Sequence, residues 1–128
     1  MTTEIDYEVE VEQDETEIRG NVIASGDDEA DREVEDTLID RVNRGDVWAW
    51  ACVRVIATIE GCDLRGESSW LGGCSYDSTR DFKESRFKIT DTATGKVTHR
   101  GYYDDMCDEA RDDLISKIKA VQRLGEVG

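Results

Sequence analysis

Alternating apolar and charged residues near the start of the chain predict a β-strand. Over Tyr7–Val11 every second residue is acidic, so this strand has one apolar face and one negative face. The acidic face carries Glu8, Glu10 and Glu12. The apolar residues Ile18, Val22 and Ile23 predict a second strand over Thr16–Ala24. The two strands together predict a β-hairpin.

The next segment has the period of an amphipathic helix. Apolar residues recur every four positions, at Ala30, Val34, Leu38 and Val42. Ser25 is the expected N-cap, and Gly45 is the expected C-terminal stop. The outward face of this helix is acidic. It is expected to carry Asp28, Asp31, Glu35 and Asp36.

The most apolar segment predicts a central strand. Val47–Ile59 is apolar at both odd and even positions, as expected of a strand covered on both faces. Trp48 and Trp50 are two residues apart, so in a strand both rings project from one face. That pair is interpreted either as core, or as a contact surface for a partner or a second copy.

The remaining patterns complete an α+β fold. They predict a loop over Gly61–Ser68, a strand over Ser69–Tyr76, a helical turn from Ser78 through Phe82, a hairpin of Arg86–Thr90 with Lys96–Arg100, and a helix over Asp104–Leu124. The order of these elements predicts one α+β domain over residues 1–128. It should have a largely antiparallel sheet of four to six strands and two main helices.

Negative charge is concentrated in the first third of the chain. The chain has 31 Asp and Glu against 16 Lys and Arg, a net charge of −15. Residues 1–46 account for −13 of this, and the remaining residues for only −2. Such a field repels nucleic acid and acidic membranes and attracts basic surfaces. No signal peptide or membrane span is visible, so a cytoplasmic location is expected.

Two interpretations of the acidity remain open. Carboxylates along the first strand and helix resemble a row of nucleic-acid phosphates, which would suit a mimic that occupies a basic cleft. The alternative is solvation, including adaptation to high salt, because Arg outnumbers Lys eleven to five and acids outnumber both. The residues expected to contact a basic partner are Glu8, Glu10, Glu12, Asp28, Asp31, Glu35, Trp48 and Trp50.

Cysteine and histidine offer a further hypothesis. Cys74 follows two glycines, and His99 is the single histidine, so the two would form the nucleophile and base of a thiol enzyme. Asp104 or Asp105 would orient the imidazole. The expected cytoplasmic location implies that the four cysteines are reduced thiols. They lack paired Cys-x-x-Cys spacing, so we expect no metal or cofactor.

Several stretches resemble a group of small acidic proteins of uncharacterised function from phage and mobile-element genomes. The resemblance lies in Glu17–Asp28, Gly45–Ala51, Gly72–Tyr76 and Gly101–Met106. It covers most of residues 17–115, and the Arg86–Arg100 hairpin is an addition. The resemblance implies an accessory or counter-defence role and no particular activity.

These observations together predict a non-catalytic inhibitor that binds a basic, nucleic-acid-handling host protein. One alternative is a structural module that forms a homodimer through Trp48 and Trp50. The other is a cysteine-dependent enzyme that uses Cys74 and His99.

Overall fold

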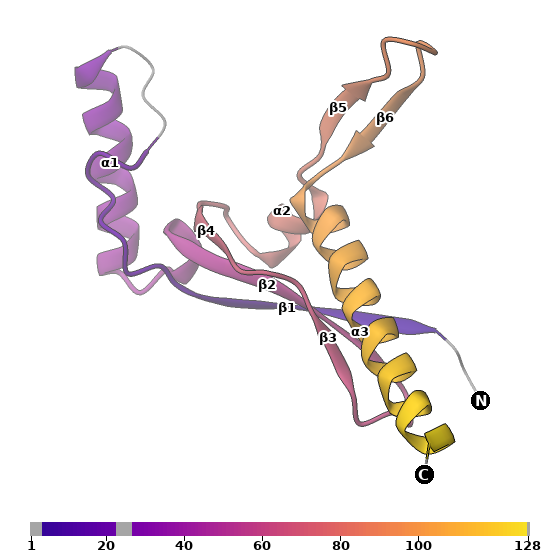
Figure 1. Ribbon diagram of the computed structural model, residues 1–128. Coiled ribbons are helices and arrows are strands. Elements are labelled where there is room, and N and C mark those ends of the chain that lie inside the picture. The colour runs from indigo at the N-terminus through magenta and orange to yellow at the C-terminus, as the bar shows by residue number, and fades with distance from the viewer. Residues whose placement is uncertain (1–3, 23–26, 128) are drawn as a thin grey trace. The chain divides into compact units, whose positions relative to one another are not determined.

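The computed structural model describes residues 4–22 and 27–127 (Figure 1). Its elements confirm the α+β class. In chain order they are β1 (Ile5–Gln13), α1 (Asp28–Asn43), the 3-10 helix η1 (Val47–Ala49), β2 (Ala51–Ile59), β3 (Arg65–Glu67), β4 (Leu71–Cys74), α2 (Thr79–Glu84), β5 (Phe87–Thr90), β6 (Val97–Arg100) and α3 (Tyr102–Val127).

The chain divides into two compact units. Unit 1 comprises Met1–Glu10, Arg54–Ser69 and Arg80–Gly128, and unit 2 comprises Val11–Val53 and Trp70–Thr79. One sheet has the strand order β1-β2-β3, with β4 also paired to β2, and a second sheet contains β5 and β6. Pairing of β2 with β3 and β4, and of β5 with β6, is antiparallel, as predicted. The single domain stays a prediction.

In unit 1 the long helix α3 packs along β3. The close approach depends on Gly66, because a Cβ atom there would lie 1.9 Å from the carbonyl oxygen of Ala110. Apolar side chains of β2, α2 and α3 are buried in this unit: Val55, Ile56, Ala57, Phe82, Met106, Ala110 and Leu114. Unit 1 therefore has a core of its own, built mainly on one stripe of α3.

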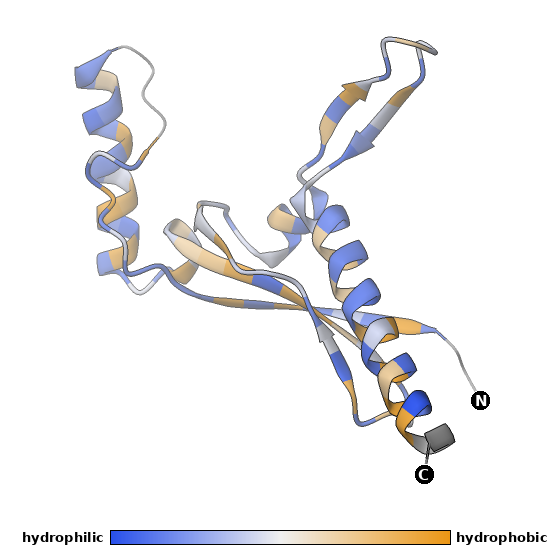
Figure 2. Cartoon of the chain, in the orientation of Figure 1, coloured by the Kyte–Doolittle hydropathy of each residue, from blue (hydrophilic) through white to orange (hydrophobic). Residues whose placement is uncertain are grey.

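In unit 2 the helix α1 is defined by local capping. The side chain of Asp27 accepts hydrogen bonds from the backbone N–H groups of Glu29 and Ala30. The predicted cap Ser25 lies outside the described residues. At the other end Gly45 has a φ of 87°, the left-handed conformation expected just beyond a helix terminus. Figure 2 shows that hydrophilic residues predominate along α1 and that apolar residues interrupt them at intervals.

The predicted strand over Thr16–Ala24 is wrong for its described part. Residues 16–22 form bends and turns, with the N–H of Asn21 bonded to the carbonyl of Ile18 at 3.1 Å. Ile18 instead packs with Leu38 and Trp50 in a small apolar cluster. The predicted hairpin with Tyr7–Val11 is therefore absent from residues 4–22. Ile23 and Ala24 lie outside the described residues.

Two further boundaries differ from the prediction. Val47–Ala49 is a 3-10 helix rather than the start of a strand, since Asp46 caps it by accepting the N–H of Trp48 at 3.1 Å. The segment Gly61–Ser68 was predicted as a loop and contains β3, which pairs with β2 through Gly66 and its neighbours. No helix within the described residues is both long and apolar enough to cross a bilayer.

Candidate partner-binding crevice

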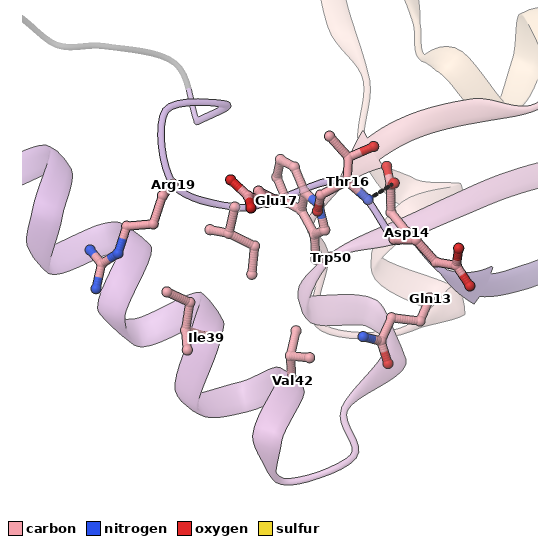
Figure 3. A pocket seen from close by; sticks show the side chains of 10 residues that line it. Gln13, Asp14, Thr16, Glu17, Arg19, Ile39, Val42 and Trp50 are labelled. Atoms are coloured by element: carbon pink, nitrogen blue, oxygen red, sulfur yellow. Dashed lines mark hydrogen bonds between the residues drawn. The ribbon is translucent and has the colours of Figure 1, made fainter.

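A crevice in unit 2 lies between residues 13–19 and helix α1 (Figure 3). It has a volume of about 350 Å³. Its apolar lining comes from Ile18, Ile39, Val42 and Trp50, and its charged lining from Asp14, Glu15, Glu17 and Arg19. The crevice therefore joins an apolar surface to a predominantly acidic one.

The wall of the crevice is fixed by hydrogen bonds between Trp50 and the chain that leaves β1. The N–H of Asp14 donates to the carbonyl of Trp50 at 3.0 Å. The indole Nε1–H of Trp50 donates to the carbonyl of Thr16 at 2.9 Å. Residues 14–16 are thus held in place without belonging to a strand.

Asp14 makes a second connection, to strand β4. Its Oδ1 accepts the N–H of Thr16 at 2.9 Å, and its Oδ2 accepts the N–H of Gly73 at 2.8 Å. Burial by itself raises the pKa of Asp14, but hydrogen bonds from the backbone of Thr16 and Gly73 and from the side chains of Thr16 and Cys52 together lower it. Asp14 is therefore a structural anion, because both of its oxygens already accept hydrogen bonds.

An acidic groove adjoins the crevice along the first turns of α1. It has a volume of about 750 Å³, and Arg19 lines both hollows. The α1 residues that line the groove are Asp28, Glu29, Asp31, Arg32 and Glu35. Four of these five are carboxylates, so the groove presents net negative charge to a ligand.

Arg19 pairs with carboxylates of α1. Its side chain pairs with Glu35 at 3.4 Å and also with Asp36. Oε2 of Glu35 additionally accepts the N–H of Gly20 at 2.8 Å. The Arg19 side chain remains 49% exposed, whereas the side chain of Glu35 is only 14% exposed.

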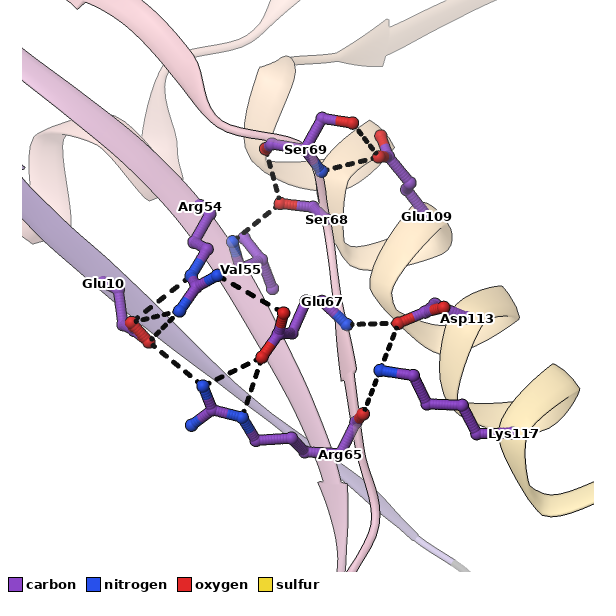
Figure 4. Close-up of polar contacts among 10 residues, drawn as sticks. All are labelled: Glu10, Arg54, Val55, Arg65, Glu67, Ser68, Ser69, Glu109, Asp113 and Lys117. Atoms are coloured by element: carbon purple, nitrogen blue, oxygen red, sulfur yellow. Dashed lines mark hydrogen bonds and ion pairs between the residues drawn. The ribbon is translucent and has the colours of Figure 1, made fainter. Parts of the chain in front are cut away.

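The glutamates predicted on β1 are divided between the units. Glu8 and Glu10 belong to unit 1, whereas Glu12 belongs to unit 2 with Asp28, Asp31 and Glu35. Glu10 is occupied, since it pairs with Arg54 at 3.1 Å and with Arg65 at 4.0 Å (Figure 4). Glu8 and Glu12 are exposed.

The network around Arg54 belongs to the packing of α3 on β3. Arg54 also pairs with Glu67 at 3.3 Å. Asp113 of α3 accepts the backbone N–H of Glu67 at 2.9 Å, and Lys117 donates to the carbonyl of Arg65 at 2.9 Å (Figure 4). Helix side chains thus satisfy the backbone of a short edge strand, and Glu10 has a structural role there.

The two tryptophans that were predicted to contact a partner are both buried. Trp48 is 7% exposed and Trp50 is 5% exposed. Trp48 lies in η1 and meets the edge of the Tyr76 ring, with centroids 6.1 Å apart. The prediction that both rings project from one face of a strand is therefore wrong. Their burial agrees with the core interpretation.

Cys74 has the environment of an inert thiol. Burial raises its pKa to about 11, and its Sγ–H donates to the carbonyl of Leu71 at 3.4 Å. At neutral pH only about one molecule in 10⁴ would carry the thiolate needed for attack. His99 lies in β6 of unit 1, opposite Lys88.

The aspartates proposed to orient His99 have other partners. Asp104 accepts the N–H of Gly101 at 2.9 Å and pairs with Arg86 at 3.1 Å. Asp105 pairs with Arg100 at 3.1 Å. These contacts are those of a capped, dipole-stabilised helix terminus. Among the described residues, no group of His, Cys, Asp and Glu has an arrangement that would hold a metal ion.

Sequence reasoning missed the apolar half of the crevice. Ile39 and Val42 are interpreted as ordinary core residues from their helical spacing, and Ile18 as a strand residue. Arg19 had a usable signal, because it is the first basic residue in a strongly acidic segment. Comparison of the chain with protein-family models, curated proteins and solved structures finds no match.

Proposed function

We propose that this chain is an accessory protein of a phage or mobile element that binds a basic, nucleic-acid-handling host protein. Binding would cover the surface that the host protein uses for nucleic acid, so the chain would act as an anti-defence inhibitor and mimic. The phage association rests on the sequence resemblance alone. The mode of binding rests on unit 2.

The observation that carries this proposal is the apolar crevice beside the acidic groove. An apolar side chain of the partner would enter between Ile18, Ile39 and Val42, where burial of apolar area favours binding. A neighbouring lysine or arginine would enter the groove and meet Asp28 and Asp31. Apolar and charged contacts side by side give a defined site, which a solvating charged surface alone does not.

Charge complementarity also sets the expected kinetics. Residues 1–46 carry a net charge of −13, and opposite charge on a partner accelerates the diffusional encounter. Salt screens this attraction over about 10 Å at 0.1 M. Association should therefore slow as salt concentration rises.

The test is capture from a host lysate at about 50 mM and about 500 mM salt. We expect a nucleic-acid-binding protein to be retained at low salt and lost at high salt. The captured protein is then purified, and its binding to labelled DNA or RNA is measured while the chain is titrated in. Displacement of the nucleic acid supports inhibition by occupation of the same surface.

Two variants with the same change of charge locate the site. Asp28→Asn, Glu29→Gln and Asp31→Asn together remove three carboxylates from the groove. Asp6→Asn, Glu60→Gln and Asp63→Asn together remove three exposed carboxylates of unit 1. We expect at least tenfold weaker binding for the groove variant and near wild-type binding for the control. Equal binding by both variants, or capture that is the same at low and at high salt, would overturn the proposal.

A further inference from the structure

The β5–β6 hairpin exposes three large apolar side chains. Within the described residues these two strands form a sheet with no third strand (Figure 1). Phe87 is 55% exposed, Ile89 48% and Val97 45%. A lone two-stranded hairpin is marginally stable in water, and its open edges can pair with another chain.

Strand register sorts the hairpin into two faces. Phe87 lies opposite Arg100, and Ile89 lies opposite Thr98, so these four residues share one face. The other face carries Lys88 opposite His99, and Thr90 opposite Val97. The first face is the larger apolar surface, because Tyr102 at the start of α3 extends it. The rings of Phe87 and Tyr102 meet edge to face, with centroids 5.7 Å apart.

Charges at the border of this face are self-complementary. Arg100 pairs with Asp105 at 3.1 Å and with Asp108 at 2.7 Å. All three side chains are partly exposed, at 40%, 69% and 49%. Under a two-fold axis the Arg100 of one copy would face the Asp105 and Asp108 of the other. A patch that carries both charges beside an apolar centre suits a copy of itself.

We propose that the hairpin face of Phe87, Ile89 and Tyr102 is the contact surface of a homodimer. Two copies would bury these side chains against each other and exchange ion pairs through Arg100. This surface replaces the tryptophan pair as the route to self-association, since Trp48 and Trp50 are buried. The inference is independent of the proposed binding of a basic partner.

Salt dependence separates the two proposals. Each copy carries a net charge of −15, so association of two copies is opposed by long-range repulsion. Salt screens this repulsion, so the dimer should tighten as salt rises. Binding of a basic partner through unit 2 should weaken over the same range.

The first measurement is sedimentation equilibrium of the full chain over a series of concentrations at about 50 mM and about 500 mM NaCl. We expect a mass that rises from 14.4 kDa toward twice that value, with tighter association at high salt. Phe87→Thr with Ile89→Thr should weaken association at least tenfold. Val97→Thr, on the opposite face, is the matched control and should leave it unchanged. A monomer under all conditions would overturn the proposal.

A cross-linking variant tests the face even if the double threonine variant unfolds. Thr98→Cys places a thiol between the apolar residues, and Lys88→Cys places one on the opposite face. Under mild oxidation we expect a reducible dimer from Thr98→Cys, well above the level formed by Lys88→Cys or the unmodified chain. Equal cross-linking at both positions would reject this face as the interface.

Discussion

Asp14 joins the chain leaving β1 to strand β4 within unit 2. It lies at the end of an acidic strand and is only 9% exposed. Its two oxygens accept the N–H groups of Thr16 and Gly73, and its own N–H donates to Trp50. Asp14 and Trp50 together therefore hold a crevice wall that belongs to no helix or strand.

Replacing Asp14 with asparagine should lower the free energy of unfolding by about 1–3 kcal/mol. The amide NH₂ would take the place of one oxygen and face a backbone N–H, so donor would meet donor. Urea denaturation at about pH 7 measures the loss. Glu15→Gln is the control, because Glu15 is an exposed neighbouring carboxylate.

Comparison of the wild type with Asp14→Asn also gives a prediction about pH. The folded state lowers the pKa of Asp14, so its stabilisation is present above the ordinary aspartate pKa near about 4. It is lost as the pH falls through the lower folded-state pKa. The stability difference between wild type and Asp14→Asn should therefore narrow between about pH 5 and about pH 2. A difference that stays constant over that range would contradict this role of the carboxylate.

At the scale of elements, periodicity predicts the helices and the β5–β6 hairpin well. Helix α3 begins two residues before the predicted Asp104, and β1 extends the predicted Tyr7–Val11 at both ends. Errors occur where a contact distant in sequence or a local cap decides the outcome. Val47–Ala49 has strand-forming composition, but Asp46 caps a 3-10 turn there. Strand β3 has no apolar residue, so only its pairing with β2 and α3 reveals it.

The packing of α3 on β3 depends on the absence of a side chain at Gly66. A methyl group at this position would lie 1.9 Å from the carbonyl oxygen of Ala110 and 2.7 Å from Cβ of Leu114. Gly66→Ala must therefore push α3 away from β3, and we expect a loss of about 3 kcal/mol or more in unfolding free energy. Thermal denaturation followed by circular dichroism measures it. Ser116→Ala, at an exposed position of α3, should change stability by less than about 0.5 kcal/mol. Equal effects of the two substitutions would show that α3 does not depend on the close approach.

At the scale of the whole molecule, charge distribution was readable from sequence and charge pairing was not. Of the acidic residues predicted to form a negative surface, Glu8, Glu12 and Asp28 are exposed, whereas Glu10, Asp31 and Glu35 are partly buried. Their partners were not predicted, because Arg54 is 44 residues from Glu10, and Arg19 is 16 residues from Glu35. The apolar half of the crevice was missed for a related reason. It forms only when Ile18 leaves the predicted strand and packs near α1.

The net charge of −15 predicts a stability that rises with salt. Repulsion among like charges opposes the compact state, and added salt screens it. We expect the melting temperature to rise by about 5 °C between about 10 mM and about 500 mM NaCl, which corresponds to roughly 1 kcal/mol for a chain of this size. A variant with Glu8→Gln, Asp28→Asn and Glu29→Gln carries three fewer negative charges and should show a smaller rise.

A plateau of the melting temperature near 500 mM NaCl is the behaviour of simple screening, whereas a continued rise into molar salt favours adaptation to a saline host. If the melting temperature of both the wild type and this variant is independent of salt, the ion pairs around Arg19, Arg54 and Arg100 already offset the repulsion among the acidic residues.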